Sequence, residues 1–197
     1  MLVSSKEGCL CIVEFLLNNG VDINSKTKDG SSALHLASSC GHLETVKCLV
    51  YSGLSVNIND DYQRKPLHEA SLSGHLHIAE FLINNGADIN SKSVSGNTAL
   101  HYSSSKGHLG IVSLLVNQGI SFDEPNNELN TPLHEASSNG HLSIVEILIK
   151  KGANINNNNK NGHSPLKLCT KNEHYNIVEL LLNSGAIYSR KYLQSVF

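Results

Sequence analysis

The sequence contains few aromatic residues, no excess of either charge and no long apolar run. Aromatic residues are 5% of its 197 residues and tryptophan is absent, so a core must be built from aliphatic side chains and alanine, which suits thin, stacked helices better than a large β-sandwich. Lysine and arginine total 15 against 17 aspartates and glutamates, for a formal net charge of -2. Proteins that bind nucleic acid through its phosphates normally carry a basic stripe, so we expect no nucleic-acid partner.

Membrane insertion and secretion are also not expected. The longest apolar stretches, such as 12–17 and 144–149, each contain a glutamate and fall well short of the roughly 18 residues that span a bilayer. The N-terminal residues MLVSSKEGCLC lack the basic start and the long apolar block of a secretory signal. The five cysteines are odd in number and irregular in spacing, which fits a reducing cytoplasmic or nuclear compartment rather than a disulfide framework.

A Leu-His pair recurs along the chain with a fixed step of 33 residues. A Gly-His pair and a further series of glycines follow the same step without an insertion. The Leu-His pairs begin at Leu34, Leu67, Leu100 and Leu133, the Gly-His pairs at Gly41, Gly74, Gly107 and Gly140, and the glycine series is Gly20, Gly53, Gly86, Gly119, Gly152 and Gly185. A period this strict predicts a one-dimensional stack, in which each unit makes the same contact with the next.

The stretch 124–156 shows how one unit is expected to fold. Thr131 is a suitable helix N-cap and Pro132 a suitable first helical residue. The short helix that they start should stop at Gly140, because glycine adopts a positive φ freely. A second helix is expected over 141–149, where apolar residues recur at helical spacing. Helices this short are marginal alone in water, so they must stack on their neighbours.

These residues resemble the ankyrin repeat, a 33-residue unit with the motif T-P-L-H-x-A. The motif is complete at 131–136 and recurs in modified form at 32–37, 65–70, 98–103 and 164–169. The resemblance implies an all-α ankyrin-repeat solenoid of stacked helix-turn-helix units with β-turn finger loops. We expect a single array over residues 1–189, made of an incomplete unit at 1–24 and whole units at 25–57, 58–90, 91–123, 124–156 and 157–189, followed by a tail or cap at 190–197.

Some positions depart from the family pattern. Gln63 and Leu129 stand where the finger turn usually has glycine, so we expect those two turns to differ in backbone shape. Lys167 replaces the motif histidine and Glu173 replaces the glycine that ends the first helix, which predicts a looser last unit. The unit at 1–24 is either a tolerated N-terminal cap or a sign that the sequence is a fragment of a longer array.

Eleven histidines invite a metal or acid–base interpretation, but their spacing argues against a single site. Eight of them form two series at 33-residue steps. Successive units lie roughly 10 Å apart, whereas the ligands of one zinc ion each lie about 2 Å from it. We therefore expect these imidazoles to hydrogen-bond to backbone in turns and between units. The two series are His35, His68, His101 and His134, and His42, His75, His108 and His141.

Other reactive groups are also interpreted as structural. Cys40 is the best candidate for an exposed thiol, but the same slot holds other residues in the other units, so we interpret it as surface. Glu69 and Glu135 occupy equivalent positions and are expected on solvated helix faces or as rim contacts. The asparagine-rich run at 157–161 is interpreted as a mobile loop. The sequence has no phosphate-binding glycine motif, and we expect no metal and no cofactor.

The resemblance implies that a protein partner binds the fingers and the exposed edge of the first helices, which line a concave surface. The slots that vary between units therefore hold the candidate binding residues, which are Asp61, Tyr62, Arg64, Leu72, Val94, Asn97, Glu128, Asn130 and His163. Tyr62, Arg64, Leu72 and Val94 stand out, because tyrosine and arginine are favoured at binding hot spots and an exposed apolar residue needs a reason. They are either the anchor of a binding patch or scattered surface residues.

The resemblance implies a non-enzymatic interaction protein, such as an adaptor, an inhibitor or an assembly chaperone, that binds another protein in the cytoplasm or nucleus. We expect it to be a monomer. The alternative is that the sequence is the recognition segment of a longer signalling enzyme, such as a kinase, an acyltransferase or an exchange factor. An in-frame catalytic domain beside the array in the full transcript would support that alternative.

Overall fold

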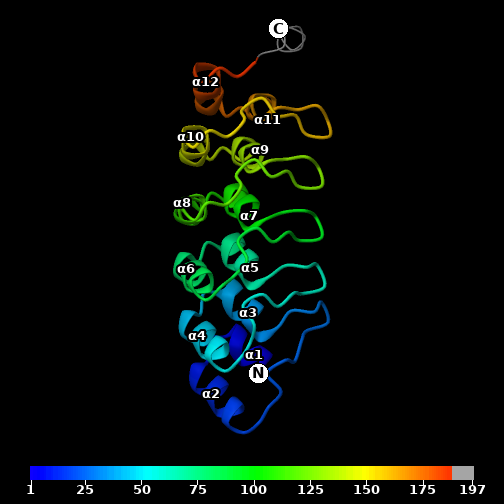
Figure 1. The fold of residues 1–197 in the computed structure, drawn as a ribbon, viewed down its shortest axis with the longest axis vertical. Helices are drawn as coiled ribbons and strands as arrows, with labels where there is room; N and C mark the ends of the chain where they lie inside the picture. The colour runs from blue at the N-terminus through cyan, green and yellow to red at the C-terminus, as the bar shows by residue number, and fades with distance from the viewer. Residues whose placement is uncertain (188–197) are drawn as a thin grey trace.

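The structure, a computed structural model, describes residues 1–187 and forms an elongated column of paired helices (Figure 1). Within these residues there are twelve α-helices, and the extended pairing is limited to an isolated bridge between Lys26 and Ser32. The helices are α1 (Leu2–Lys6), α2 (Leu10–Asn18), α3 (Ala33–Cys40), α4 (Leu43–Tyr51), α5 (Pro66–Ser73), α6 (Leu76–Asn84), α7 (Ala99–Lys106), α8 (Leu109–Asn117), α9 (Pro132–Ser138), α10 (Leu142–Lys150), α11 (Pro165–Lys171) and α12 (Tyr175–Asn183). The expected tail or cap at 190–197 lies outside the described residues.

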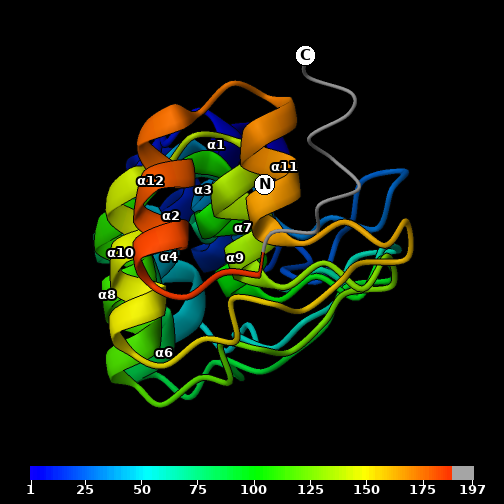
Figure 2. The same cartoon turned by 90° about the horizontal axis from the view of Figure 1, so that it is seen from above.

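The helices form two layers, with a row of loops on one side. The odd-numbered helices, called the inner helices below, stack on one another, and the even-numbered outer helices stack beside them (Figure 1). Five loops project from the inner layer, away from the outer helices, and each leads into the inner helix that follows it (Figure 2). These loops, called the first to fifth fingers, are 26–32, 59–65, 92–98, 125–131 and 158–164. The all-α stacked solenoid expected from the sequence is confirmed.

The inner helices start at the N-caps that the sequence specifies. In α9 the backbone N–H of Thr131 donates to Nδ1 of His134 at 3.1 Å, and Pro132 stands at the first helical position. Ser32, the N-cap of α3, and Thr98, the N-cap of α7, bond in the same way to the histidine three residues later. Because the cap and the histidine belong to one motif, each repeat that keeps the motif histidine carries its own helix start signal.

The core is aliphatic, as the shortage of aromatic residues predicted. The largest fully buried side chains are leucines and isoleucines. They include Leu34, Leu67, Leu100 and Leu133 in the inner helices, and Ile78, Ile111, Ile144 and Ile177 in the outer helices. These rows run from one helix pair to the next, so the apolar burial that stabilises each pair comes largely from its neighbours.

The repeating histidines hydrogen-bond to backbone, which confirms the prediction. In the first series, Nε2 bonds to a carbonyl oxygen in the next finger, as in His101 to Asn130 at 3.0 Å, or, for His68, to that of Ser91 directly before the finger. In the second series, Nε2 bonds back to a carbonyl oxygen of the preceding inner helix, as in His75 to Ser39 at 3.0 Å. His174 extends the second series by one more member. Both series therefore join neighbouring helix pairs instead of converging on an ion.

Gln63 and Leu129 do not change the shape of their fingers, so that prediction was wrong. Their φ values are 55° and 58°, in the same left-handed region as the 77° of Gly96. The residue at the finger base holds this conformation: Asn126 Oδ1 accepts hydrogen bonds from the N–H groups of residues 128 and 130, at 2.9 and 3.0 Å. A side chain at positive φ costs roughly 1–2 kcal/mol, and the clamped finger outweighs that cost.

Most of the asparagine-rich run at 157–161 lies in the fifth finger, where side-chain hydrogen bonds hold it. Asn159 Oδ1 accepts hydrogen bonds from the N–H groups of Asn161 and His163, both at 3.0 Å, and its Nδ2 donates to Asn130 Oδ1 at 2.9 Å. The expectation of a mobile loop was wrong because asparagine is the residue that clamps this kind of turn. The looser last unit stays a prediction.

Candidate functional site

Neighbouring fingers are joined at their tips by backbone hydrogen bonds. The N–H of Val94 donates to the carbonyl oxygen of Tyr62 at 2.8 Å, and that of Lys160 to the carbonyl oxygen of Glu128 at 3.0 Å. Asp61 donates in the same way to Asp29, and Asn127 to Ser95, so the donor residues recur every 33 residues along the chain. The five fingertips therefore form one continuous row beside the inner helices (Figure 2).

Three successive fingers expose an apolar side chain. Tyr62 and Val94 are each 55% exposed, and Leu129 is 45% exposed. Tyr62 and Val94 were candidates from the sequence, whereas Leu129 was considered there only as a missing glycine. An apolar side chain held in solvent at a positive φ is uncommon, and strained backbone tends to occur at functional positions. Of the polar candidates, Asp61 and Glu128 are also exposed.

Arg64 lies at the exit of the second finger, where two carboxylates hold it. Its Nη2 is 2.7 Å from Asp60 Oδ2, and its Nη1 is 2.9 Å from Glu69 Oε1. The guanidinium carbon also lies 5.2 Å from the centroid of the Tyr62 ring. Asp60 is 5% exposed, so loss of Arg64 would leave a buried charge unpaired. Arg64 therefore supports the second finger and the position of Tyr62.

Glu69 and Glu135 turn toward the fingers that precede their helices, so of the two expectations for them the solvated helix face was wrong and the rim contact agrees with the structure. Glu69 is 8% exposed, and burial raises its pKa although the charge of Arg64 acts in the opposite direction. Glu135 is half-buried. Burial also raises the pKa of Glu135, against the hydrogen bond that Asn130 Nδ2 donates to its Oε1 at 3.1 Å. Both carboxyl groups thus belong to the surface between fingers and inner helices.

The other polar candidates lie half-buried at the finger exits. Asn97 Oδ1 accepts a hydrogen bond from Asn126 Nδ2 at 2.8 Å, and Asn130 Oδ1 accepts one from Asn159 Nδ2 at 2.9 Å. His163 occupies the same place in the fifth finger. The Asn97 and Asn130 amides link the third finger to the fourth and the fourth to the fifth, so they hold this part of the surface in shape and also form part of it.

Leu72 does not join the other candidates. It is the seventh residue after Lys65, the N-cap of α5, which places it about 10 Å along the helix from the finger exit. The structure therefore brings Tyr62, Arg64 and Val94 together and leaves Leu72 at the far end of α5.

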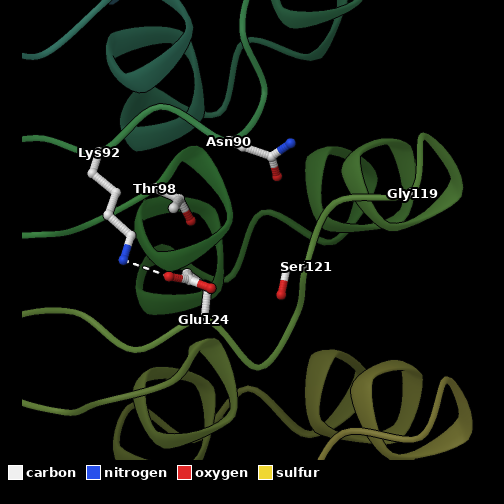
Figure 3. Close-up of a pocket in the computed structure, with 6 residues that line it drawn as sticks. All are labelled: Asn90, Lys92, Thr98, Gly119, Ser121 and Glu124. Atoms are coloured by element: carbon white, nitrogen blue, oxygen red, sulfur yellow. Dashed lines mark hydrogen bonds and ion pairs between the residues drawn. The ribbon is translucent and has the colours of Figure 1, made fainter.

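A pocket of about 380 Å³ lies between the third finger and the loop after α8 (Figure 3). It is lined by Asn90, Lys92, Thr98, Gly119, Ser121 and Glu124. Lys92 Nζ and Glu124 Oε1 pair at 2.6 Å along one side, so the two charges of the lining neutralise each other. The Thr98 hydroxyl contacts His101 Nδ1 at 2.9 Å, but burial lowers the pKa of His101 to about 4, too low for an effective base near neutral pH.

The thiols and the metal-ligating side chains within the described residues do not form a catalytic or metal site. Within residues 1–187, no group of three histidine, cysteine, aspartate or glutamate side chains is arranged to hold a metal ion. Cys40 is exposed, as predicted. Cys169 is fully buried, and burial raises its pKa to about 11, which keeps it in the unreactive thiol form. In the described part of the chain, no helix combines the length and the apolar character that crossing a bilayer requires.

The chain was compared with curated proteins and with models of protein families. A comparison with curated proteins found no match to the chain. The family model for ankyrin repeats (three copies) matches residues 1–93, 90–159 and 130–192. These matches overlap and span almost the entire sequence, in agreement with the paired helices, the fingers and the T-P-L-H-x-A motif. The chain belongs to the ankyrin-repeat family.

Proposed function

We propose that this chain is a non-enzymatic adaptor, inhibitor or assembly chaperone that binds another protein through its fingertips and inner helices. Ankyrin-repeat arrays are generally protein–protein interaction modules and are typically non-catalytic. We place it in the cytoplasm or nucleus as a monomer, and its free cysteines, three of them exposed, support a reducing compartment.

The apolar fingertips are the observation that carries this proposal. Tyr62, Val94 and Leu129 expose apolar surface on three adjacent fingers, and the Val94–Tyr62 backbone bond keeps the first two in register. Hydrophobic groups held in a row on a rigid scaffold are suited to contact a partner without a large loss of conformational entropy. We call Tyr62, Val94 and Leu129 the fingertip patch.

Affinity purification followed by mass spectrometry, comparing the wild-type chain with a Tyr62→Ala/Val94→Ala variant, tests the proposal. The partner should be recovered by the wild type and bind the variant more weakly by about 2 kcal/mol, which is roughly thirtyfold in Kd. Arg64 is a poor choice for this test, because its removal leaves Asp60 unpaired.

Tyr175→Ala is the matched control. Tyr175 is 68% exposed on the outer helix α12, so its loss removes an exposed ring elsewhere on the array. Unfolding by urea should show that all variants stay folded. Equal binding by the wild type and the fingertip variant would contradict the proposed surface, and turnover of a substrate by the purified chain would contradict the non-enzymatic role.

A further inference from the structure

The second and fourth fingers present the same geometry with two charges different, because Asp60 and Arg64 of the second finger correspond to Asn126 and Asn130 of the fourth. Glu69 in α5 and Glu135 in α9 occupy equivalent positions, two 33-residue steps apart, and each contacts the finger residue that lies five positions before it. That residue is Arg64 in the second finger and Asn130 in the fourth. The molecule thus contains an internal comparison between a neutralised carboxylate and one beside an uncharged amide.

In the second finger, the positive charge is supplied by the chain itself. Arg64 Nη1 lies 2.9 Å from Glu69 Oε1, and Nη2 and Nε lie 2.7 and 2.8 Å from Asp60 Oδ2. The guanidinium therefore joins Asp60 at the base of the finger to Glu69 in the inner helix α5, and the Glu69 side chain is buried. This arrangement shows that an arginine side chain fits between a finger and an inner helix of this array.

In the fourth finger, that positive charge is missing. Asn130 Nδ2 donates one neutral hydrogen bond to Glu135 Oε1 at 3.1 Å, and the base of the finger is Asn126 where the second finger has Asp60. Within residues 1–187, no lysine, arginine or histidine side chain pairs with Glu135. Glu135 is also more open to solvent than Glu69.

The residues around Glu135 suit a cationic side chain with an apolar stem. The equivalent positions of the flanking inner helices hold Tyr102 and Leu168, both half-buried. Glu128, on the tip of the same finger, adds a second and largely exposed carboxylate, with Lys160 as a loose partner at 3.6 Å. A half-buried carboxylate without a counter-ion gains most from a cation that arrives with a partner and excludes water.

We propose that Glu135 and Asn130 form a subsite for an arginine side chain of the bound protein, which takes the place that Arg64 fills beside Glu69. This inference rests on the proposed function, since it names the chemistry of the segment that the fingers and inner helices bind. The occupant is a partner segment with one arginine, flanked by apolar residues that reach the fingertip patch.

A random nonapeptide display library, selected on the full chain, provides the probe. Binding peptides should share an arginine at one position. The best of them is then synthesised twice, once with that arginine and once with citrulline, which keeps the shape and removes the charge. Titration followed by fluorescence anisotropy should show at least about tenfold weaker binding of the citrulline peptide.

Variants of the protein test the same contact from the other side. Glu135→Gln removes the charge, and Asn130→Arg supplies the internal guanidinium that the second finger already has, so both should weaken the arginine peptide about tenfold and the citrulline peptide much less. Glu146→Gln, on the exposed face of α10, makes the same change in net charge away from the groove and should have no effect. The citrulline comparison needs no protein variant, so it decides the matter even where a variant folds poorly.

The outcomes separate this inference from the proposed function. Peptides that bind the chain and lose affinity with Tyr62→Ala, but not with citrulline, Glu135→Gln or Asn130→Arg, would leave the interaction surface standing and overturn the arginine subsite. A library from which the chain retains no peptide at all would count against both.

Discussion

His134 donates from Nε2 to the carbonyl oxygen of His163, 3.1 Å away in the next finger. On the other side of the ring, Nδ1 accepts the N–H of Thr131 at 3.1 Å. The ring can make both bonds only as the neutral tautomer with its hydrogen on Nε2, because a proton on Nδ1 would face another donor. Burial accordingly lowers the pKa of His134 to about 4. The N-cap bond from Thr131 therefore depends on a neutral imidazole, whereas the Nε2 bond to the next unit can form in either protonation state.

The array should lose stability in mild acid. Burial lowers the pKa values of His68, His101 and His134 to about 4, whereas histidine in the unfolded chain titrates near 6.5. Between these values the unfolded state binds more protons, so stability that is present at pH 7 is lost as the pH falls from 6.5 toward 4. At pH 5 the loss is about 1–2 kcal/mol for each histidine. Urea unfolding at pH 7.5 and pH 5.0 measures it as a lower midpoint in acid.

Two carboxyl groups act in the opposite direction. Burial raises the pKa values of Glu69 and Glu135, so the folded state binds their protons more readily and gains from acid below the raised values. The shifted histidines outnumber these two carboxyl groups, so the net change should still be a loss of stability in acid. An unchanged urea midpoint at pH 5.0, or NMR titration of these imidazoles near pH 6.5 in the folded chain, would contradict the prediction.

Replacing a row of inner-helix serines by alanine should stabilise the protein. The hydroxyl groups of Ser5, Ser38, Ser71, Ser104 and Ser137 are fully buried and have no hydrogen-bond partner within the described residues. Ser104→Ala removes one such hydroxyl and should raise the free energy of unfolding by about 1 kcal/mol. The neighbouring Ser103→Ala is the control, because its buried hydroxyl donates to the carbonyl oxygen of Ala99 at 3.0 Å. Urea unfolding in which Ser104→Ala is no more stable than Ser103→Ala would refute this.

Replacing a side chain that is held at positive φ by glycine should stabilise the folded protein. Leu129 and Gln63 are strained, because each holds a side chain at positive φ, 58° and 55°. Leu129→Gly or Gln63→Gly would relieve this strain but would give the unfolded chain more conformational entropy. The net increase in the free energy of unfolding should be about 0.5–1 kcal/mol. Gly162→Ala is the reverse experiment, since Gly162 has φ 68° and open space around its Cα. It should cost about 1 kcal/mol. Thermal unfolding measures all three, and a destabilised Leu129→Gly variant would show that the side chain supports the finger.

The repeat, the aliphatic core and the helix starts could be predicted because each is encoded within one unit. The bond between Thr131 and His134 spans three residues of a single motif, and it recurs with the motif. The shape of the fourth finger could not be predicted from Leu129 alone, since Asn126 sets it by clamping residues 128 and 130. Local preference at one position was overruled by hydrogen bonds from another.

The binding surface was predicted less completely than the fold. Exposed Tyr62 and Val94 follow from their variable slots. The environment of Glu69 does not, because it depends on Arg64 five residues earlier folding back from the finger onto the helix. The two positions belong to different parts of the unit, and a comparison of units one slot at a time does not reveal that they form a pair.

Equivalent isoleucines should differ in their contribution to stability according to their place in the stack. Ile144 is 1% exposed between neighbouring outer helices, whereas Ile12, at the equivalent position of α2, is 51% exposed. Ile144→Ala should therefore lower the free energy of unfolding by about 3 kcal/mol, through lost burial and a cavity. Ile12→Ala should cost less than about 1 kcal/mol, because half of its side chain already meets water. Urea unfolding at several protein concentrations measures both, and a cost for Ile12→Ala that equals that of Ile144→Ala and grows with concentration would show that a second copy covers this end of the stack.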